Sequence, residues 1–376
     1  WKICREPCKE IMMKVPYNDL TRIHSPLSEE LEMIFKKALD CSQFIGGDHI
    51  GNFERKFENV FNVQNAVACG NGTDAILGCL KALNLAPGDE VIVPAMTWIS
   101  SAEVVNLAGG IPVFCDVDEA SFVAEADNIR SKITKKTKGI ILVHLYGNMP
   151  KMDEIMSLVN ELGLWLIEDC AQAHLSSFNS KAAGTFGDFG TFSFFPGKNL
   201  GALGDAGATC ASNVNNATYL RAFFNHGAIS KHDHFIIGTN SRLDAIQAQI
   251  LNTKLSHLDE WTKDRIRIGQ IYDDAFSGNN SIITQFIHDG VVNSRHIYPI
   301  IVDDRKKYTD ALSKVNIAFN LNYPRPLHKQ RTYFDDNRGA ILKVSELVAN
   351  QAISLPIFPK MTFKEVEHVI DTVLNV

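Results

Sequence analysis

The sequence predicts an α/β protein, in which a three-layer α/β/α domain with a mostly parallel sheet precedes a smaller α+β domain. The first observation is length, because 376 residues are too many for one ordinary hydrophobic core and indicate two domains. The second is an alternation of helical and strand-like patterns between about residues 70 and 212. The third observation is that the chain after this alternating region combines long helical segments with a strand. We expect a leader or added segment at 1–13, a large domain at 14–255 and a small domain at 256–376.

The elements of the larger domain follow one another in a regular order. Residues 73–83 place Ile76, Cys79, Leu80 and Leu83 on one helical face. The next runs are strand DEVIVPAM, helix SSAEVVNLAG, strands IPVFCDVD and GIILVHLYG, helix MDEIMSLVNELG and strand LWLIEDCA, with TFSFF and GATCAS as further strands. Such alternation is typical of a mainly parallel sheet with helices on both faces.

The C-terminal part mixes helices with a strand. Residues 241–276 are proline-free and helical in character, as one long helix or as two with a break near Gly269. The run SRHIYPIIVDD predicts a strand, whereas RKKYTDALSKV and LVANQAIS predict helices. The closing TFKEVEHVIDTVLNV is also helical, with one apolar stripe formed by Phe363, Val366, Val369, Ile370 and Val373.

Composition excludes several classes of protein. A net charge of −6 gives no general attraction to nucleic acid or to anionic lipid. No apolar run approaches the roughly 18 residues of a membrane span, and the first residues, WKICREPCKEIMMK, lack the apolar stretch of a signal peptide. The eight cysteines are scattered without CxxC spacing, which disfavours disulfides and zinc; Cys79, Cys115 and Cys170 resemble small buried hydrophobes. We expect a cytoplasmic protein without a metal.

Ligands of open parallel sheets bind beyond the carboxyl ends of the strands, so the residues there are the first candidates. The run CGNGTD, residues 69–74, leads directly into a helix. Its glycines let the backbone approach a ligand, and the helix N-terminus offers N–H groups to a phosphate. A plain tight turn capped by Thr73 is the simpler interpretation. The run is neither a Rossmann fingerprint, because Gly78 is out of register, nor a P-loop.

Two further strand ends carry chemical groups. Asp169 ends the apolar run LWLIED, where a carboxylate needs a cationic or N–H partner such as a protonated pyridine nitrogen. Strand-end aspartates also cap turns. Lys198 stands between an apolar strand and a glycine-rich loop, where its amine could bond covalently to pyridoxal phosphate. A lone loop lysine is usually solvated, but the order of phosphate-type helix start, carboxylate and lysine favours the cofactor.

Seven ordered motifs resemble those of the DegT/StrS-type nucleotide-sugar aminotransferases. They are GNGTDA, EDCAQAH, SFFPGKNLGALGDAGA, FFNHG, NSRLDAIQAQIL, YPRPLHKQ and SLPIFP. The resemblance extends from about Val15 to the C-terminus. It implies a pyridoxal-phosphate-dependent transferase of fold type I that acts as a homodimer. One departure is AHLSS after Gln172, where the family usually has AHGA; Lys198 is retained, which disfavours the dehydratase branch with histidine at this position.

The resemblance implies a role for each matching residue around the cofactor ring. Lys198 would carry the cofactor and move the proton during catalysis. Asp169 would keep the pyridine nitrogen protonated, which makes the ring an electron sink. Gln172 would bind the ring hydroxyl, and Ala171 and Trp98 would pack on the two ring faces. Trp98 could instead be an ordinary core aromatic.

For the cofactor phosphate, the resemblance implies backbone N–H groups of Gly72 and Thr73 and the hydroxyl of Ser193. Asn225 of FFNHG would reach the same phosphate from the neighbouring subunit, so that the active sites would lie at the homodimer interface. Ser193 could simply point outward from a strand, and Asn225 could simply end a helix.

The sugar diphosphate or the donor carboxylate requires cationic or polar partners. The candidates, each of which could equally be a surface or structural residue, are Lys231, Arg242, Arg325 and His328. The three histidines of NHGAISKHDH are better explained as a solvated loop than as a metal site, since nothing completes a ligand set.

The lysine motif PGKNLGALGDAGA resembles the branch that aminates C3 of dTDP-3-keto-6-deoxyhexoses, with L-glutamate as the expected donor. Such enzymes make deoxyamino sugars for glycans such as the O-antigen of lipopolysaccharide. Alternatives within the family are amination at C4 and a UDP-linked sugar. A different class, a non-catalytic regulator that binds pyridoxal phosphate, is disfavoured because no helix-turn-helix or basic region is evident. A Rossmann dehydrogenase fails on its missing glycine fingerprint.

Overall fold

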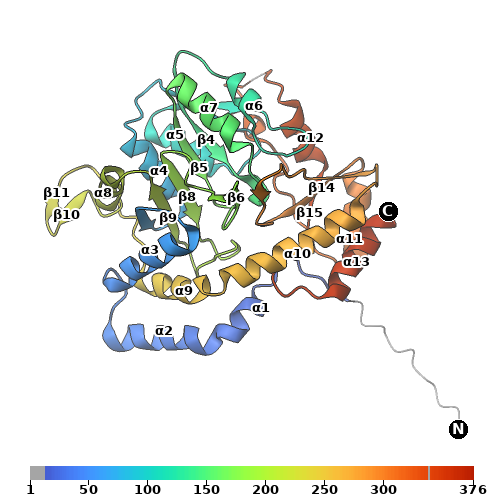
Figure 1. Cartoon of the computed structure of the whole chain (residues 1–376), viewed down its shortest axis with the longest axis horizontal. Helices are drawn as coiled ribbons and strands as arrows, with labels where there is room; N and C mark the ends of the chain where they lie inside the picture. The colour runs from blue at the N-terminus through green and yellow to red at the C-terminus, as the bar shows by residue number, and fades with distance from the viewer. Residues whose placement is uncertain (1–12, 338) are drawn as a thin grey trace, which may run out of the picture.

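A computed structural model describes residues 13–337 and 339–376 (Figure 1). The predicted leader therefore lies outside the described residues except for Met13. A seven-stranded sheet occupies the centre, in the order β1-β9-β8-β5-β4-β2-β3. Its strands are β1 (Ala66–Cys69), β2 (Glu90–Pro94), β3 (Ile111–Cys115), β4 (Thr137–Val143), β5 (Trp165–Asp169), β8 (Phe189–Ser193) and β9 (Gly207–Ala211). Strand β9 runs antiparallel to both of its neighbours, and the other neighbouring pairs are parallel, which confirms the mostly parallel sheet.

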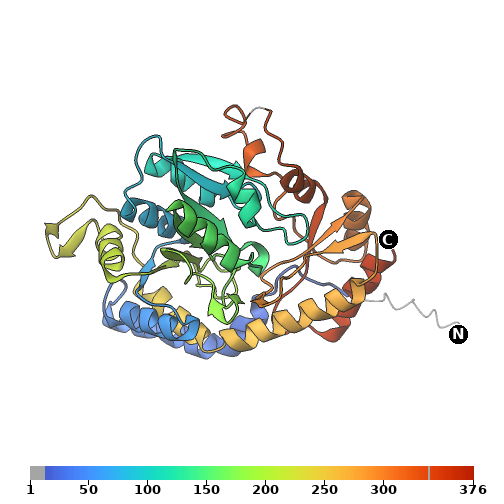
Figure 2. The same ribbon diagram turned by 45° about the horizontal axis from the view of Figure 1, so that its top comes forward.

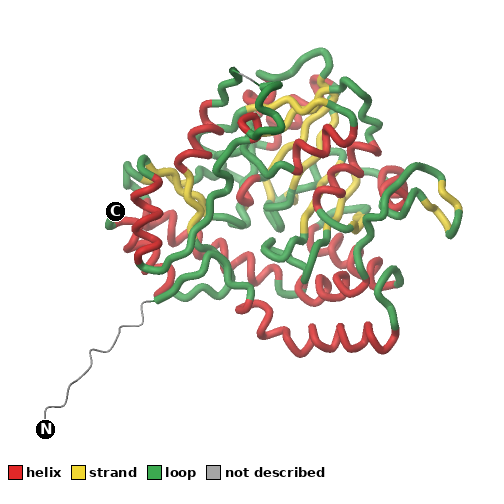
Figure 3. The backbone as a smooth tube through the Cα atoms, turned by 180° about the vertical axis from the view of Figure 1, so that it is seen from behind, coloured by secondary structure: helices red, strands yellow, loops and turns green. Residues whose placement is uncertain are grey.

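Helices cover both faces of this sheet, because successive strand residues point into different cores. Val91 and Val93 belong to one apolar cluster, whereas Ile92 between them belongs to the other. The first cluster includes residues of α4 (Gly72–Ala82), α5 (Ser100–Ala108) and α8 (Val214–Phe223), and the second includes residues of α3 (Asp48–Phe61), α7 (Met152–Leu162) and α9 (Ala245–Leu255). Figure 3 shows the main group of strands enclosed by helices. The predicted three-layer architecture is confirmed.

The C-terminal part has its own small sheet and core. Strands β12 (Ile282–Thr284), β14 (Tyr298–Val302) and β15 (Ala352–Leu355) form an antiparallel sheet, and the helices there are α11 (Arg305–Lys314), α12 (Lys343–Gln351) and α13 (Phe363–Leu374). Helix α10 (Leu258–Phe276) extends from beneath the large sheet to these elements (Figure 2). Val15 also packs in this core and pairs with Ile317. The division at residues 255 and 256 stays a prediction, and Val15 shows that the N-terminal segment returns to the C-terminal core.

Two sequence expectations about the helices are corrected. The long helical stretch is divided at Ser256 and His257, between α9 and α10, and Gly269 lies inside α10. Glycine is needed there for packing, because a Cβ atom would stand 2.9 Å from Nε of Arg295. The run LVANQAIS is helical only as far as Gln351, and its last residues form β15 in the small sheet.

The remaining elements are short or belong to the N-terminal segment. They are α1 (Thr21–His24), α2 (Ser28–Cys41), α6 (Ala126–Arg130), the sheet β13-β6-β7 (Val291–Val292, Ser177–Phe178 and Lys181–Ala182) and the hairpin of β10 (Ala228–Ser230) and β11 (Asp233–His234). Six cysteines lie in the described ranges and are free; Cys79, Cys115 and Cys170 are buried, as expected. No helix of the described ranges combines the length and apolar composition of a membrane span.

Candidate active site

A cavity of about 680 Å³ lies beyond the carboxyl ends of β2, β4, β5 and β8. This is the edge of the sheet at which ligands of parallel α/β proteins bind. The cavity is lined by every predicted cofactor-binding residue except Asn225, namely Gly72, Thr73, Trp98, Asp169, Ala171, Gln172, Ser193 and Lys198. Residues distant in the sequence thus converge on one site.

Asp169 ends β5 and is 6% exposed. One carboxylate oxygen accepts a 2.9 Å hydrogen bond from the hydroxyl of Ser101, and the other accepts a 3.1 Å bond from the backbone N–H of Ala171. These two bonds fix the orientation of the carboxylate at the edge of the cavity. They are the N–H and hydroxyl donors that a carboxylate at the end of an apolar strand requires.

Lys198 follows β8 in a tight loop, in which its backbone N–H donates to the carbonyl of Phe195 at 2.8 Å. The next residue, Asn199, anchors the loop: it donates to the carbonyl of Ser294 at 3.2 Å and accepts a 2.9 Å bond from Nδ1 of His296. Burial lowers the pKa of Lys198 to about 8, against the opposing attraction of Asp169. A substantial fraction of the amine is therefore neutral near physiological pH and able to act as a nucleophile or base.

The N-terminus of α4 faces the same cavity. Asn71, not Thr73, is the capping residue, and its side chain accepts a 2.8 Å bond from the N–H of Asp74. The Thr73 hydroxyl lies 2.8 Å from that of Ser100. Within the described residues, no hydrogen-bond partner is recorded for the N–H groups of Gly72 and Thr73, which leaves two donors for an anion.

Ser193 packs directly against this helix start. A Cβ atom on Gly72 would lie 2.8 Å from the Ser193 Cβ, so only glycine permits the approach of the two segments. The end of β8 and the start of α4 therefore form one cradle of N–H and hydroxyl groups, of the kind that binds a phosphate.

Gln172 is held by two neighbours, with one amide hydrogen remaining. Its side-chain oxygen accepts a 2.8 Å bond from the N–H of Tyr146, and its amide donates a 2.9 Å bond to the hydroxyl of Tyr323. Because the amide has two hydrogens, the second can donate to a ligand. The Trp98 ring lies 5.6 Å from the Tyr323 ring and is 58% exposed, so Trp98 is no core aromatic.

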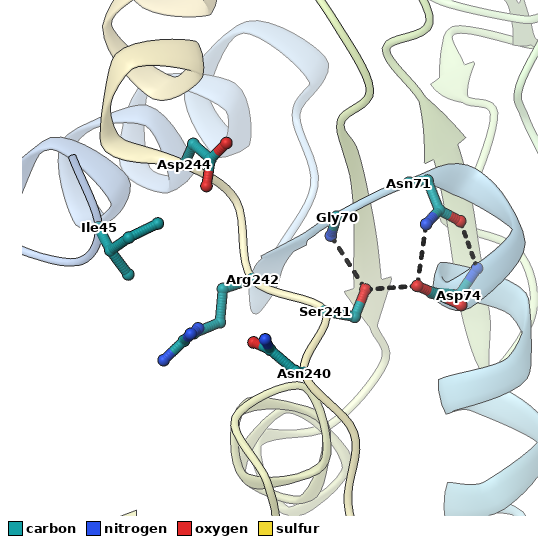
Figure 4. A pocket seen from close by; sticks show the side chains of 8 residues that line it. All are labelled: Ile45, Gly70, Asn71, Asp74, Asn240, Ser241, Arg242 and Asp244. Carbon is teal, nitrogen blue, oxygen red and sulfur yellow. Dashed lines mark hydrogen bonds between the residues drawn. The ribbon is translucent and has the colours of Figure 1, made fainter.

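Asn225 and Arg242 lie outside this lining and meet each other. The Arg242 guanidinium is 3.4 Å from the Asn225 side-chain oxygen, and both residues are exposed. Arg242 lines a second cavity, of about 250 Å³, on the other side of Asn71 and Asp74. Figure 4 shows Ser241 bonded between Gly70 and Asp74, with the Arg242 side chain directed away from them.

The other substrate candidates are dispersed. Lys231 is exposed at the tip of the β10–β11 hairpin, which projects from the body at the left of Figure 1. Arg325 is exposed and does not line the cavity. His328 is completely buried, with Nε2 3.0 Å from a carboxylate oxygen of Glu346. This environment is that of a structural residue, and a role of His328 in substrate binding has no support from its position.

Sequence reasoning missed several residues that line the cavity, above all Tyr323, Phe195, Asp205 and Ser100. Tyr323 belongs to the motif YPRPLHKQ, which drew attention only to its basic residues. Burial raises its pKa, so its hydroxyl stays neutral. Ser100 and the nearby Ser101 follow Trp98 and Ile99 at the start of α5, and no local pattern distinguishes them from ordinary residues of a helix start.

One buried group of potential metal ligands occurs in the described part of the chain: His144, Glu168 and Cys170. Glu168 is already engaged, since His144 Nε2 lies 2.9 Å from it and its oxygens accept bonds from the backbone N–H groups of Gly184, Phe186 and Gly187. It thereby holds the turn before β8. The loop histidines 226, 232 and 234 are all exposed. The expectation of no metal stays a prediction.

Comparison with known proteins identifies relatives over nearly the whole chain. The profile of the DegT/DnrJ/EryC1/StrS aminotransferase family matches residues 27–374. A UDP-N-acetyl-3-dehydro-alpha-D-glucosamine 3-aminotransferase of Acidithiobacillus ferrooxidans is 37% identical, over 94% of this chain and 96% of that protein. A dTDP-3-amino-3,6-dideoxy-alpha-D-galactopyranose transaminase of Aneurinibacillus thermoaerophilus is 35% identical, over 96% of this chain and 98% of that protein. A protein of Geobacillus stearothermophilus called pleiotropic regulatory protein is also 35% identical, over the same shares of the two chains.

Two solved structures have the same fold as this chain over nearly its whole length. The crystal structure of DesV from S. venezuelae has a TM-score of 0.93 and 32% identity, and covers 96% of this chain and 98% of its own. That of NtdA from Bacillus subtilis, with bound cofactor PMP, has a TM-score of 0.90 and 28% identity, and covers 98% of this chain and 86% of its own.

Proposed function

The chain belongs to the DegT/DnrJ/EryC1/StrS aminotransferase family, and we propose that it transfers an amino group from L-glutamate to C3 of a dTDP-3-keto-6-deoxyhexose. Family membership itself gives the general activity, that of a pyridoxal-phosphate-dependent nucleotide-sugar aminotransferase. The observation that carries the proposal is the convergence of Lys198, Asp169 and the free N-terminus of α4 on one cavity. Position C3 is supported by two relatives, one named as a 3-aminotransferase and the other as a transaminase for a 3-amino sugar.

The described residues fit pyridoxal phosphate. The unpaired N–H groups of Gly72 and Thr73 suit a phosphate, and the Ser193 hydroxyl lies in the same cradle. Asp169 suits a protonated pyridine nitrogen, as a carboxylate with a fixed orientation. When bound, the cofactor supplies an electron sink for charge that develops on the substrate carbon.

The remaining chemistry falls to this chain's own residues. Lys198, with its lowered pKa, holds the cofactor and moves the proton at the substrate carbon. Gln172 would donate its free amide hydrogen to the ring hydroxyl, since Tyr146 and Tyr323 fix the orientation of the amide. Ala171 and Trp98 line the cavity and would pack on the two faces of the ring. Arg242, Arg325 and Lys231 are retained as candidates for the anionic parts of the substrates.

We further propose that the enzyme is a homodimer in which Asn225 completes the phosphate site of the partner subunit. Asn225 is exposed and is the one predicted cofactor residue absent from the lining of this chain's own cavity. The adjacent β10–β11 hairpin and the residues directly after it carry the exposed apolar residues Ile229, Phe235 and Ile237, which are 63%, 73% and 94% exposed. Exposed apolar groups of this size favour burial against another surface.

The test begins with the visible absorbance of the protein loaded with pyridoxal phosphate, before and after addition of glutamate. Glutamate should convert the yellow form to the pyridoxamine form. The aminated protein is then offered dTDP-linked 3-keto and 4-keto 6-deoxyhexoses and UDP-linked 3-keto sugars, and the amino sugar is identified by mass spectrometry. Exclusive turnover of a 4-keto sugar would refute C3, and exclusive turnover of UDP sugars would refute dTDP.

The rival class, a regulator that binds the cofactor without catalysis, gives a different outcome. It predicts a yellow protein whose absorbance glutamate and other amino donors leave unchanged. One relative bears the name of a regulatory protein, which is the observation in favour of testing this class. Lys198→Ala serves as the reference for a protein without turnover.

A further inference from the structure

Two buried hydroxyl groups, those of Ser101 and Thr97, lie beside Asp169, and Thr97 also lines the cavity. The Ser101 Oγ lies 2.9 Å from Oδ2 of Asp169, and the Thr97 Oγ1 lies 3.2 Å from the Ser101 Oγ. Ser101 is fully buried in the first turn of α5, and Thr97 is 3% exposed in the segment between β2 and α5. Asp169 is 68 positions further along the chain than Ser101, so the contact is tertiary and not local.

The chemistry of the groups fixes the direction of these bonds. An ionised carboxylate only accepts hydrogen bonds, so the single hydroxyl proton of Ser101 must point to Asp169. Ser101 then has no proton left for Thr97, and Thr97 must donate to the Ser101 oxygen. The order is Thr97 to Ser101 to Asp169, and bonds aligned in this way strengthen one another.

We propose that Thr97 and Ser101 form a directed pair of hydroxyl donors that keeps Asp169 ionised and oriented, and thereby keeps the proton on the ring nitrogen of pyridoxal phosphate. Thr97 and Ser101 are positioning residues, since they act through Asp169. The proposal rests on the role of Asp169 under the proposed function.

The sign of the effect follows from the competition for one proton. Hydrogen bonds to the carboxylate stabilise its negative form and make it a weaker base. A weaker base leaves the shared proton on the ring nitrogen. Loss of the Ser101 hydroxyl makes Asp169 a stronger base and draws the proton toward the carboxylate, so the ring becomes a weaker electron sink.

Few other groups face Asp169 from the surrounding elements. Lys198, from the loop after β8, is the cation that acts on it electrostatically. The hydroxyl of Tyr323 and the thiol of Cys170 are the acidic groups coupled to it, and burial raises the pKa of both, so each stays neutral. The carboxylate thus depends on Ser101 and on the N–H of Ala171 for its hydrogen bonds.

The experiment uses the full-length protein, loaded with pyridoxal phosphate that carries ¹⁵N at the ring nitrogen. The variants are Ser101→Ala, Ser101→Thr and Thr97→Val, with Asp169→Asn as the reference for loss of the carboxylate. Ser131→Ala is the control, since it removes an exposed hydroxyl that bonds only to the carbonyl of Asn128. The ring ¹⁵N chemical shift and the dissociation constant for the cofactor are measured at one pH, and thermal unfolding checks the fold of each variant.

Ser101→Ala should move the ¹⁵N shift toward that of unprotonated pyridine and weaken cofactor binding about tenfold, as expected for a lost bond to a charged group. Thr97→Val should act in the same direction with a smaller effect, and Ser101→Thr should restore the wild-type shift. Asp169→Asn should give the largest change. If Asp169→Asn changes the shift while both hydroxyl variants match wild type, the donor pair is refuted alone. If Asp169→Asn leaves the shift unchanged, the assigned role of Asp169 fails and the donor pair with it.

Discussion

Gly72→Ala should weaken the binding of pyridoxal phosphate while the apoprotein stays folded. The new Cβ atom would stand 2.8 Å from the Cβ and 3.2 Å from the Cα of Ser193, and ordinary contact begins at 3.4 Å. The start of α4 and the end of β8 must therefore separate by several tenths of an ångström. A phosphate bond of about 2.9 Å would lengthen to about 3.5 Å, beyond the usual range.

The magnitude follows from the two N–H donors at this helix start. A hydrogen bond to a charged group contributes about 1.5–3 kcal/mol. The loss of one such bond corresponds to about 10- to 150-fold weaker binding, because 1.4 kcal/mol is a factor of ten.

The assay is a titration of the apoprotein with pyridoxal phosphate, followed by visible absorbance. Gly51→Ala in α3 is the matched control, because its Cβ would meet only the flexible end of Arg55, at 3.3 Å. Thermal unfolding of both apoproteins separates a binding defect from misfolding. Wild-type affinity of a folded Gly72→Ala protein would refute the phosphate cradle.

Three further predictions concern Lys198 and His328. Lys198→Ala should abolish turnover while the circular dichroism spectrum stays that of wild type; near-full activity would sink the assignment. Burial lowers the pKa of Lys198 to about 8, so the rate of cofactor capture by the apoprotein should rise with pH and level off above about pH 8. Capture by Nα-acetyl-lysine, the control, should rise until about pH 10.4. If both rates rise over the same pH range, the lowered pKa of Lys198 is contradicted. His328→Ala should lower the unfolding free energy by about 1–3 kcal/mol and leave the KM for the sugar unchanged; the opposite pattern would return His328 to the substrate site.

The candidate residues named from the sequence converge on one cavity where chemistry and topology combine. Asp169 ends an apolar strand and Lys198 follows another, and parallel strands bring their carboxyl ends to one edge of the sheet. Tyr323 escaped prediction because its place depends on a contact with Gln172 across 151 positions. Ser101 reaches Asp169 in the same way, through the packing of α5 on the sheet. Local patterns contain no information on such contacts.

Local sequence patterns also do not explain why glycine occupies two of the helical positions. In the sequence, Gly78 stands out of register for a Rossmann fingerprint, and in the structure a Cβ atom there would stand 2.6 Å from the ring of Phe224. It therefore permits the close packing of α4 against residues around the end of α8. Gly269 likewise accommodates Arg295 and does not interrupt α10. Both glycines are explained by partners that are distant in the sequence.

The choice between enzyme and cofactor-binding regulator depends on turnover and not on binding of the cofactor. Binding of the cofactor requires the phosphate cradle and Asp169, which either class would contain. Sequence identity does not separate the classes, because a relative named as a regulator and one named as a transaminase are both 35% identical over the same share of this chain. Proton transfer at a substrate carbon additionally requires an amine that is partly neutral at working pH. Burial lowers the pKa of Lys198 to about 8, which gives the amine this property. A regulator that captures the cofactor covalently uses the same neutral amine, so the lowered pKa meets a requirement of catalysis without separating the two classes, and the absorbance change on addition of glutamate decides between them.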